Sequence, residues 1–274
     1  MATLPIALIQ TRTPASPAAA FAHVEPLIRD AAAGGAKLIL TPEATNFLIK
    51  DPAARAAALT TQDRDAVIGN LRALAQELGV WLLIGSAIVK SGHEGDDRAA
   101  NRSLLIDDAG AVVATYDKLH VYDVDLPTGE RWRESAAIRP GDGAVVADTP
   151  WARLGLTICY DIRFPHLYRA LAKAGAGMIS VPAAFTVPTG DAHWETLLRA
   201  RAIETGCYIA APGQVFRHAK GARACFGHSL VADPWGAVLA ERADEGAGVV
   251  LAELAAARVA QVRTQLPALS HRVL

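Results

Sequence analysis

The sequence has few cysteines, no long apolar run and no excess of charge of either sign. Three cysteines in a chain of 274 residues are an odd number, which predicts neither a disulfide framework nor an oxidising compartment. No stretch reaches the length that crosses a bilayer, and the N-terminal MATLPIALIQ lacks the basic segment and long apolar run of a secretory signal. We therefore expect a cytoplasmic protein with no membrane as partner.

The charges are balanced along the chain. There are 27 lysines and arginines against 28 aspartates and glutamates, and no basic stripe that would bind a phosphate backbone. Nucleic acid is therefore not an expected partner. Hydrophobic residue types make up 51% of the sequence, which at this length favours one large domain, residues 1–274, over two small ones.

Strands and helices are predicted to alternate in both halves of the chain. Apolar runs at Pro5–Gln10 and Lys37–Leu40 alternate with helical spacing at residues 21–31 and 67–78. A middle region without helices follows, with strands at Trp81–Val89, Arg102–Ile106 and Ala111–Tyr116. The second half again alternates: strands Leu154–Ile158, Met178–Val181 and Tyr208–Ala211, helices His166–Ala174 and Ala192–Thr205, and two strands around Asp233–Gly236. This order predicts an α/β fold of two packed sheets with helices outside.

Cys159 follows the apolar strand Leu154–Ile158 directly and precedes a polar turn and a helix. We expect its side chain to be exposed there, and nearby backbone N–H groups and the positive end of the helix to favour the thiolate. Cys159 is therefore a candidate nucleophile. A single cysteine is more often a small buried apolar residue, so the residue alone does not decide between the two readings.

Glu43 and Lys118 occupy the same kind of place as Cys159. Glu43 follows the strand Lys37–Leu40, and Lys118 follows the strand Ala111–Tyr116. Singly, each is usually a solvated surface charge. Together with a thiol they form the set that amide hydrolysis requires: a nucleophile, a proton carrier and a cation for the developing oxyanion. The combination predicts an amide hydrolase.

These three residues, in this order and with similar surroundings, resemble the motifs of the nitrilase superfamily of carbon–nitrogen hydrolases. The resemblance covers nearly the whole chain. It implies a four-layer α-β-β-α sandwich, commonly dimerised, without metal or organic cofactor, which hydrolyses an amide on a short keto-acid. Four segments resemble its Nit amidase branch, and within that branch the amidases of deaminated glutathione: Ala192–Glu195, Leu198–Thr205, Phe226–Ser229 and Asp233–Gly236.

The resemblance also implies roles for single residues. Cys159 would be the nucleophile, Glu43 the general base and acid, and Lys118 an oxyanion donor together with the backbone N–H of Tyr160. It implies that Glu134 orients the lysine or the substrate. From the residues alone, Glu134 would be a solvated carboxylate.

A keto-acid amide of this kind has a carboxylate at each end, which calls for cationic partners. Arg163 and the basic loop Arg217–Arg223 are the candidates, although a structural ion pair or a solvated loop would explain the same residues. Phe185 and Thr186 join Tyr160 as expected substrate-binding residues. Two long loops, Lys90–Ala100 and Val121–Gly143, are expected to be functional, and Leu126–Arg139 could reshape the pocket.

The other cysteines predict no chemistry. Cys207 lies in an apolar run and is expected to be a core thiol, whereas Cys225 matches no catalytic position. Cys225 and His228 could form half of a zinc site, but no second such pair is present, so no metal is expected.

Several alternatives stay open. An ω-amidase acting on 2-oxoglutaramate or 2-oxosuccinamate, or an N-carbamoyl amidase, would use the same three residues. A catalytically silent homologue that serves as a binding module would not need them. A papain-like enzyme would need a different cysteine motif and a histidine, of which His166 is the nearest example.

Overall fold

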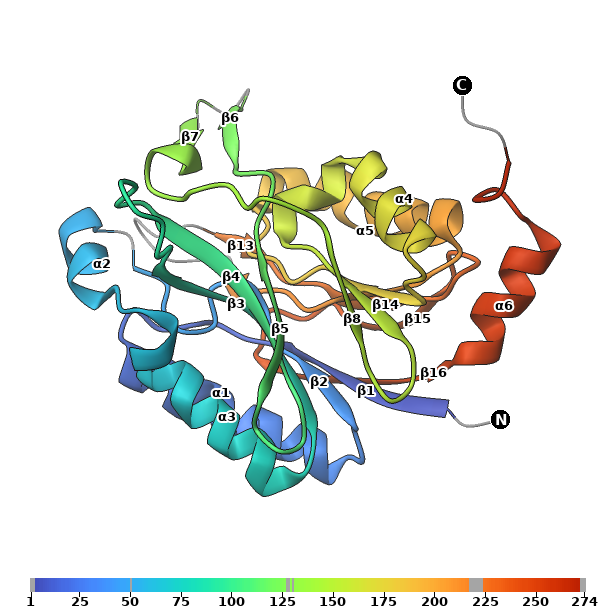
Figure 1. Cartoon of the computed structure of the whole chain (residues 1–274), viewed down its shortest axis with the longest axis horizontal. Coiled ribbons are helices and arrows are strands. Elements are labelled where there is room, and N and C mark those ends of the chain that lie inside the picture. Colours follow the sequence, from blue (N-terminus) through green and yellow to red (C-terminus); the bar gives the residue numbers. More distant parts are fainter. Residues whose placement is uncertain (1–2, 50, 127–128, 130, 217–223, 272–274) are drawn as a thin grey trace.

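Two six-stranded sheets face each other in the computed structural model, which describes residues 3–49, 51–126, 129, 131–216 and 224–271. Helices cover the outer face of each sheet (Figure 1). The helices α1 (Pro17–Ala33) and α3 (Ala66–Leu78) lie on the first sheet, and α4 (Pro165–Lys173) and α5 (Val187–Thr205) lie on the second. The expected four-layer α-β-β-α sandwich is confirmed.

The first sheet has the strand order β16-β1-β2-β3-β4-β5. The central strands β1, β2 and β3 are parallel, because α1 and the segment containing α3 return the chain to the same edge of the sheet. The outer strands pair antiparallel. The bounds are β1 (Thr3–Gln10), β2 (Leu38–Leu40), β3 (Trp81–Lys90), β4 (Ala99–Ile106), β5 (Val112–Asp117) and β16 (Gly248–Ala255).

The second sheet has the strand order β15-β14-β11-β10-β9-β8. Here β9, β10 and β11 are parallel, and the remaining strands pair antiparallel. The bounds are β8 (Val145–Asp148), β9 (Arg153–Leu156), β10 (Met178–Ser180), β11 (Tyr208–Ala211), β14 (Ser229–Ala232) and β15 (Val238–Arg242). The carboxyl ends of both parallel sets carry the site described below.

The core has two layers, and β1 contributes to both because its side chains alternate between the faces of the sheet. Ile6 and Leu8 pack between the sheets against residues such as Leu156. Ala7 and Ile9 pack under α1 and α3. A strand covered on both faces reads as a continuous apolar run, which is why Pro5–Gln10 was predictable as a strand.

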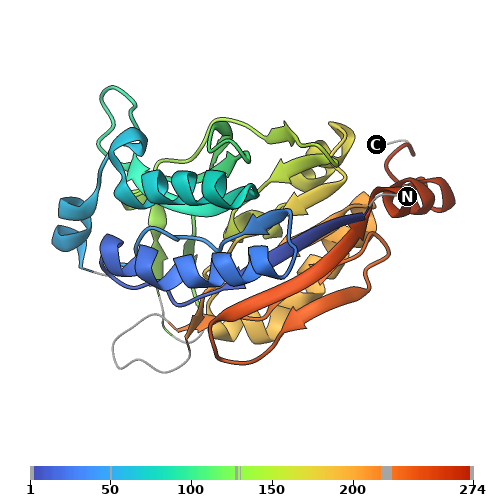
Figure 2. The ribbon, with the colours of Figure 1, turned by 90° about the horizontal axis from the view of Figure 1, so that it is seen from below.

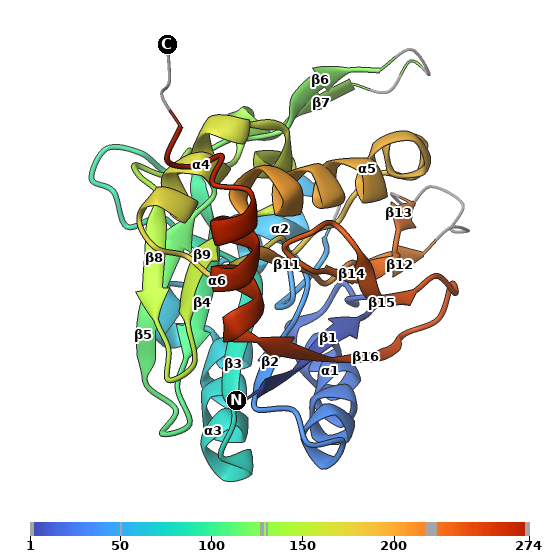
Figure 3. The same cartoon turned by 90° about the vertical axis from the view of Figure 1, so that its right-hand side faces the viewer.

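Some elements differ from the sequence-based expectation. The stretch 121–143 is not irregular throughout: it holds the hairpin β6 (Asp123–Asp125) and β7 (Arg131–Arg133) and the short helix η2 (Glu134–Ala136). This hairpin projects from the body of the molecule in Figure 3. The helix α5 begins five residues before Ala192, because its Pro188 lies in the first turn, where no backbone donor is needed.

Short elements complete the chain. The helices α2 (Pro52–Ala58) and α6 (Ala256–Gln265) lie at opposite ends of the molecule (Figures 1 and 2). Two-residue strands pair at β12 (Val215–Phe216) and β13 (Cys225–Phe226). Within the described ranges, the helices are all too short or too polar to span a bilayer.

Candidate active site

Glu43 is held by a turn that packs on β3. The turn leaves β2 at Thr41 and passes so close to Gly85 that a Cβ there would lie 1.9 Å from the Thr41 carbonyl oxygen. The Ser86 hydroxyl accepts the N–H of Ala44 at 2.8 Å, and Ala44 has a φ of 58°, which is uncommon for a residue other than glycine. The backbone thus fixes the direction in which Glu43 points.

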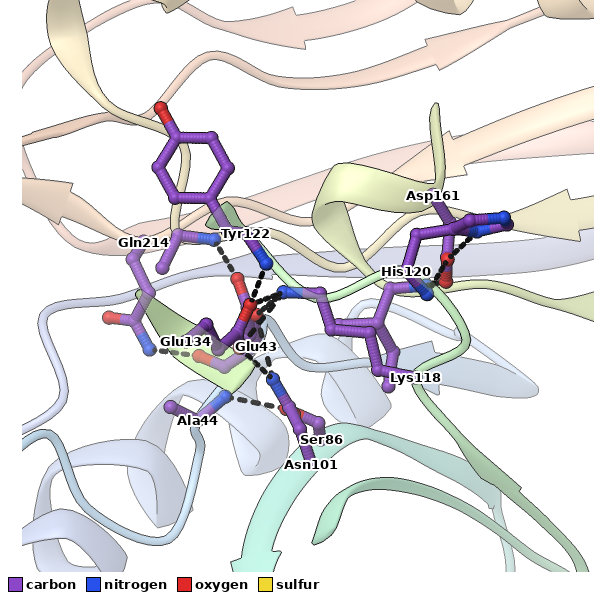
Figure 4. Close-up of polar contacts among 12 residues, drawn as sticks. Glu43, Ala44, Ser86, Asn101, Lys118, His120, Tyr122, Glu134, Asp161 and Gln214 are labelled. Carbon is purple, nitrogen blue, oxygen red and sulfur yellow. Dashed lines mark hydrogen bonds and ion pairs between the residues drawn. The ribbon is translucent and has the colours of Figure 1, made fainter. Parts of the chain in front are cut away.

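The Glu43 carboxylate is buried and accepts hydrogen bonds from a lysine, an asparagine and a main-chain N–H (Figure 4). Its Oε1 accepts from Lys118 Nζ at 3.1 Å and from Asn101 Nδ2 at 2.9 Å. Its Oε2 accepts the main-chain N–H of Ala184, from the second sheet, at 2.8 Å. Gln214 donates to the Glu43 carbonyl at 2.9 Å. A carboxylate held this way is positioned for proton transfer.

Lys118 lies between two carboxylates. Its Nζ is 3.1 Å from Glu43 and 2.9 Å from Glu134, whose Oε2 also accepts the Tyr122 N–H at 2.6 Å. Burial alone would lower the pKa of Lys118, but the negative charges of Glu134, Glu43 and Cys159 outweigh burial and raise it. The residue is therefore an ammonium. The reading of Glu134 as a solvated carboxylate is wrong, because its side chain is only 19% exposed and paired.

Cys159 begins the short helix η3 (Cys159–Arg163) just beyond β9. Its N–H donates to the Pro182 carbonyl at 2.9 Å, and its φ of 50° is left-handed. A strained backbone of this kind persists only where the surroundings impose it. The expectation of an exposed side chain is wrong: Cys159 is 5% exposed and opens into a pocket. The α-helix that follows starts only at Pro165, so its positive end is not adjacent.

Asp161 joins the two segments that carry Lys118 and Cys159, and the sequence reasoning missed it. Its fully buried carboxylate accepts a hydrogen bond from the Tyr116 hydroxyl at 2.7 Å. It also accepts from the His120 N–H at 3.0 Å and lies 2.7 Å from His120 Nδ1 (Figure 4). Tyr116 and His120 flank Lys118 at a distance of two residues. Alternate residues of an extended chain share a face, so polar groups at that spacing were the available signal.

The four predicted catalytic residues line one pocket of about 230 Å³, together with apolar side chains. They are Glu43, Lys118, Glu134 and Cys159. Segment 121–143 supplies six lining residues, whereas loop 90–100 supplies none: the segment's six are Tyr122, Trp132, Arg133, Glu134, Ala137 and Ile138. Cys207 and Cys225 are fully buried and do not line this pocket. Within the described ranges, no three His, Cys, Asp or Glu side chains are grouped to hold a metal ion.

Cys159 also borders a second, small recess. Three of the four residues that we expect to bind substrate line it: Tyr160, Phe185 and Thr186. Arg163 does not line it but lies behind, with its guanidinium 5.4 Å from the Phe185 ring centre and 3.4 Å from His193 Nδ1. The predicted basic loop 217–223 lies outside the described residues.

The fold and this arrangement define a carbon–nitrogen hydrolase: the model of that family matches residues 5–264, and the chain belongs to it. Its relatives include deaminated glutathione amidases of Bos taurus, 43% identical over 90% of this chain and 75% of the relative, and of Yersinia enterocolitica, 42% identical over 86% and 82%. The resemblance read from the motifs is confirmed.

Solved structures agree with this assignment. The NitFhit protein of C. elegans matches with a TM-score of 0.89 and 36% identity, over 98% of this chain and 65% of its own. An amidase from Nesterenkonia sp. matches with a TM-score of 0.78 and 30% identity, over 96% of this chain and 95% of its own.

Proposed function

We propose that this hydrolase cleaves deaminated glutathione to 2-oxoglutarate and cysteinylglycine, a metabolite-repair reaction, with Cys159 as nucleophile. One observation carries the catalytic part: Glu43, Lys118 and Glu134 form a buried hydrogen-bonded group in the pocket that Cys159 borders. The names of the relatives support the substrate. We further propose that the protein works in the cytoplasm as a homodimer, without metal or organic cofactor.

In the first half-reaction the Cys159 thiol gives its proton to Glu43, and the resulting thiolate attacks the amide carbon. The N–H of Tyr160 and the Lys118 ammonium stabilise the oxyanion. Glu43 then gives its proton to the departing amine, the carbon–nitrogen bond breaks, and a thioester on Cys159 remains. Cysteinylglycine leaves before water enters, so the kinetics are ping-pong.

In the second half-reaction Glu43 takes a proton from water, and the resulting hydroxide attacks the thioester carbon. The carbon–sulfur bond then breaks and 2-oxoglutarate leaves. Glu43 returns its proton to the departing sulfur, which restores the thiol of Cys159 and the carboxylate of Glu43. Glu134 holds the lysine in place throughout. Covalent chemistry in the family is supported by a solved structure of a mutant Nesterenkonia amidase, in which the acetamide moiety of fluoroacetamide is covalently added at the active site cysteine.

The small recess suits the keto-acid end of the substrate. Phe185 and Thr186 line it, and Arg163 lies close enough to receive a carboxylate once its weak contact with His193 is exchanged. A guanidinium forms a stronger hydrogen bond with a carboxylate, where both partners are charged, than with an imidazole nitrogen. We therefore assign substrate binding at this end to Tyr160, Arg163, Phe185 and Thr186. A carboxylate role for loop 217–223 stays a prediction.

The test compares two substrates that share the acyl part. We expect kcat/KM for deaminated glutathione to exceed that for 2-oxoglutaramate at least ~10-fold, because one extra charge-assisted hydrogen bond on the leaving group contributes about 1.5–3 kcal/mol. Release of 2-oxoglutarate from both substrates is followed with the purified protein. Equal rates, or faster release from 2-oxoglutaramate, would instead identify an ω-amidase.

A further inference from the structure

The pocket contains a guanidinium that has no ionic partner among the residues that the structure describes. Three cationic side chains among the described residues line it: Arg55, Lys118 and Arg133. Lys118 pairs with Glu43 and Glu134, and Nη2 of Arg133 donates to both carboxylate oxygens of Asp125, at 2.8 and 3.0 Å. Arg55, on α2, is half-buried and makes no side-chain hydrogen bond or ion pair with any described residue.

The electrostatics of the pocket make this arginine useful. Glu43 and Glu134 carry two negative charges against the single ammonium of Lys118, so the catalytic group has a net charge of about −1 before the thiolate is counted. An anionic substrate is repelled by such a site unless a fixed cation faces its charge. A guanidinium, which is planar and always charged, binds a carboxylate through two parallel hydrogen bonds.

The geometry indicates which end of the substrate Arg55 meets. Glu43 must protonate the departing amine, so the leaving group lies on the Glu43 side of Cys159. Glu43 and Arg55 line the same pocket, and neither borders the small recess that holds Phe185. The acyl part therefore points into the recess and the amine into the pocket.

We propose that Arg55 is a specificity residue that binds a carboxylate on the amine leaving group. The preferred substrates are then amides whose leaving amine is itself an acid, such as a short peptide with a free carboxyl terminus. This inference rests on the proposed function and adds the residue that reads the leaving group. The contact is remote from the reacting atoms and acts on binding, so its loss raises KM more than it lowers kcat.

The helix that carries Arg55 tolerates its removal. No residue of α2 is buried, and the helix is capped by Asp51, which accepts the Ala54 N–H at 2.8 Å. Arg55→Ala therefore leaves the core unchanged, and Arg55→Lys keeps the charge but loses the two-pronged geometry. Arg131→Ala is the matched control, because Arg131 on the nearby β7 is 81% exposed and does not line the pocket.

The experiment combines these variants with two substrates: deaminated glutathione and its analogue with a carboxamide in place of the terminal carboxylate. We expect Arg55→Ala to lower kcat/KM for the carboxylate substrate by about 10- to 100-fold, mainly through KM, and for the carboxamide by less than about threefold. Arg55→Lys should recover part of the loss, and Arg131→Ala should match the wild type on both.

The two claims fail in different ways. Wild-type turnover of deaminated glutathione alone decides the proposed function, whereas the carboxylate-to-carboxamide ratio across the variants decides the role of Arg55. The role of Arg55 is overturned if Arg55→Ala lowers kcat/KM equally for both substrates or not at all, or if the wild type does not prefer the carboxylate. It is also overturned if Arg55→Ala keeps that preference while Arg217→Ala, Lys220→Ala or Arg223→Ala removes it.

Discussion

The two sheets share one pattern of parallel and antiparallel strands but contribute different chemistry. In each, three parallel strands are flanked by one antiparallel strand on one side and by an antiparallel pair on the other. Glu43 is the third residue after β2, and Ala183 is the third after β10, each directly behind a proline. Cys159 is likewise the third residue after β9. In the first sheet Leu8 of β1 occupies the place of Leu156 of β9, so Thr11 is the residue equivalent to Cys159.

The fold thus sets equivalent positions at the strand ends of both sheets, and the residue type at each position decides its chemical role. The first sheet supplies the carboxylate and the ammonium, and the second supplies the thiol. The sets meet because the turns after β2 and β10 touch, with the N–H of Ala184 bonded to Glu43. Equivalent positions hold an alanine and a threonine, which supply no comparable group.

Cys159→Ala removes the thiol that the second sheet contributes. We expect a folded protein whose amidase turnover falls by ~10⁴-fold or more, because no other group can form the covalent bond. Cys207→Ala and Cys225→Ala should stay active. A limiting thiol alkylator should label Cys159 first, as mass spectrometry of the peptides would show. Preferential labelling of Cys225 with activity intact would contradict the assignment.

The contribution of the first sheet is tested by Lys118→Met, which removes the ammonium at nearly constant length. We expect kcat to fall by ~10²–10³-fold, as for the loss of one oxyanion donor. Steady-state kinetics should show KM changing much less than kcat. A kcat within about threefold of wild type, well under ~1.4 kcal/mol, would leave Lys118 without a catalytic role.

The contact between the two sheets is tested by Gly85→Ala. A Cβ at Gly85 would meet the Thr41 carbonyl at 1.9 Å and the Pro182 Cβ at 2.5 Å, so both turns must move. We expect a loss of about 1–3 kcal/mol in the free energy of unfolding, measured in urea, and a lower kcat. The control is Gly69→Ala on α3, where nothing lies within 4 Å, and it should stabilise by about 0.5–1 kcal/mol. Equal stability of both variants would refute this account of Gly85.

The smallest expected effect concerns pH. Burial lowers the pKa of Lys118, and the charges of Glu134 and Glu43 reverse that shift and raise it. The charged lysine therefore stabilises the fold below its ordinary pKa of about 10.4, and this contribution is lost only as pH rises through the still higher folded pKa. Glu134→Gln removes one of the negative charges that raise the pKa of Lys118, so the alkaline loss of activity should move to lower pH.

The measurement is the pH–rate profile of wild type and variant. Glu77→Gln serves as the control, since its carboxylate is 58% exposed on α3 and pairs with Arg29 away from the site. A profile for Glu134→Gln that matches the wild type on the alkaline side would show that Glu134 does not hold the charge of Lys118.

Much of the fold was predictable because buried parallel strands and amphipathic helices leave periodic patterns. The failures have local causes. The hairpin β6–β7 is short and half-exposed, so it lacks an apolar face. Pro188 and Gly190 hid the first turn of α5. Gly190 is required there, because a Cβ would lie 2.3 Å from the Phe226 ring.

The candidate site was predictable only where chemistry and strand ends coincide. Glu43, Lys118 and Cys159 each follow a strand that is recognisable in the sequence. Glu134 was found through resemblance alone, because the short elements around it, β7 and η2, leave no periodic pattern. Asn101, Asp161 and Arg55 were missed. Their partners or their pocket come from segments distant in sequence, as when Asn101 bonds Glu43 at 2.9 Å, and such contacts exist only after folding.

The central claim is that the second sheet's cysteine carries the acyl group while the first sheet moves the proton. The most direct measurement is peptide mass spectrometry of protein quenched in acid during a single turnover. With deaminated glutathione and with 2-oxoglutaramate, we expect the same 2-oxoglutaryl group on Cys159, because both reactions pass through the same thioester. An acyl group on another residue, or turnover in which Cys159 stays unmodified at every quench time, would contradict it.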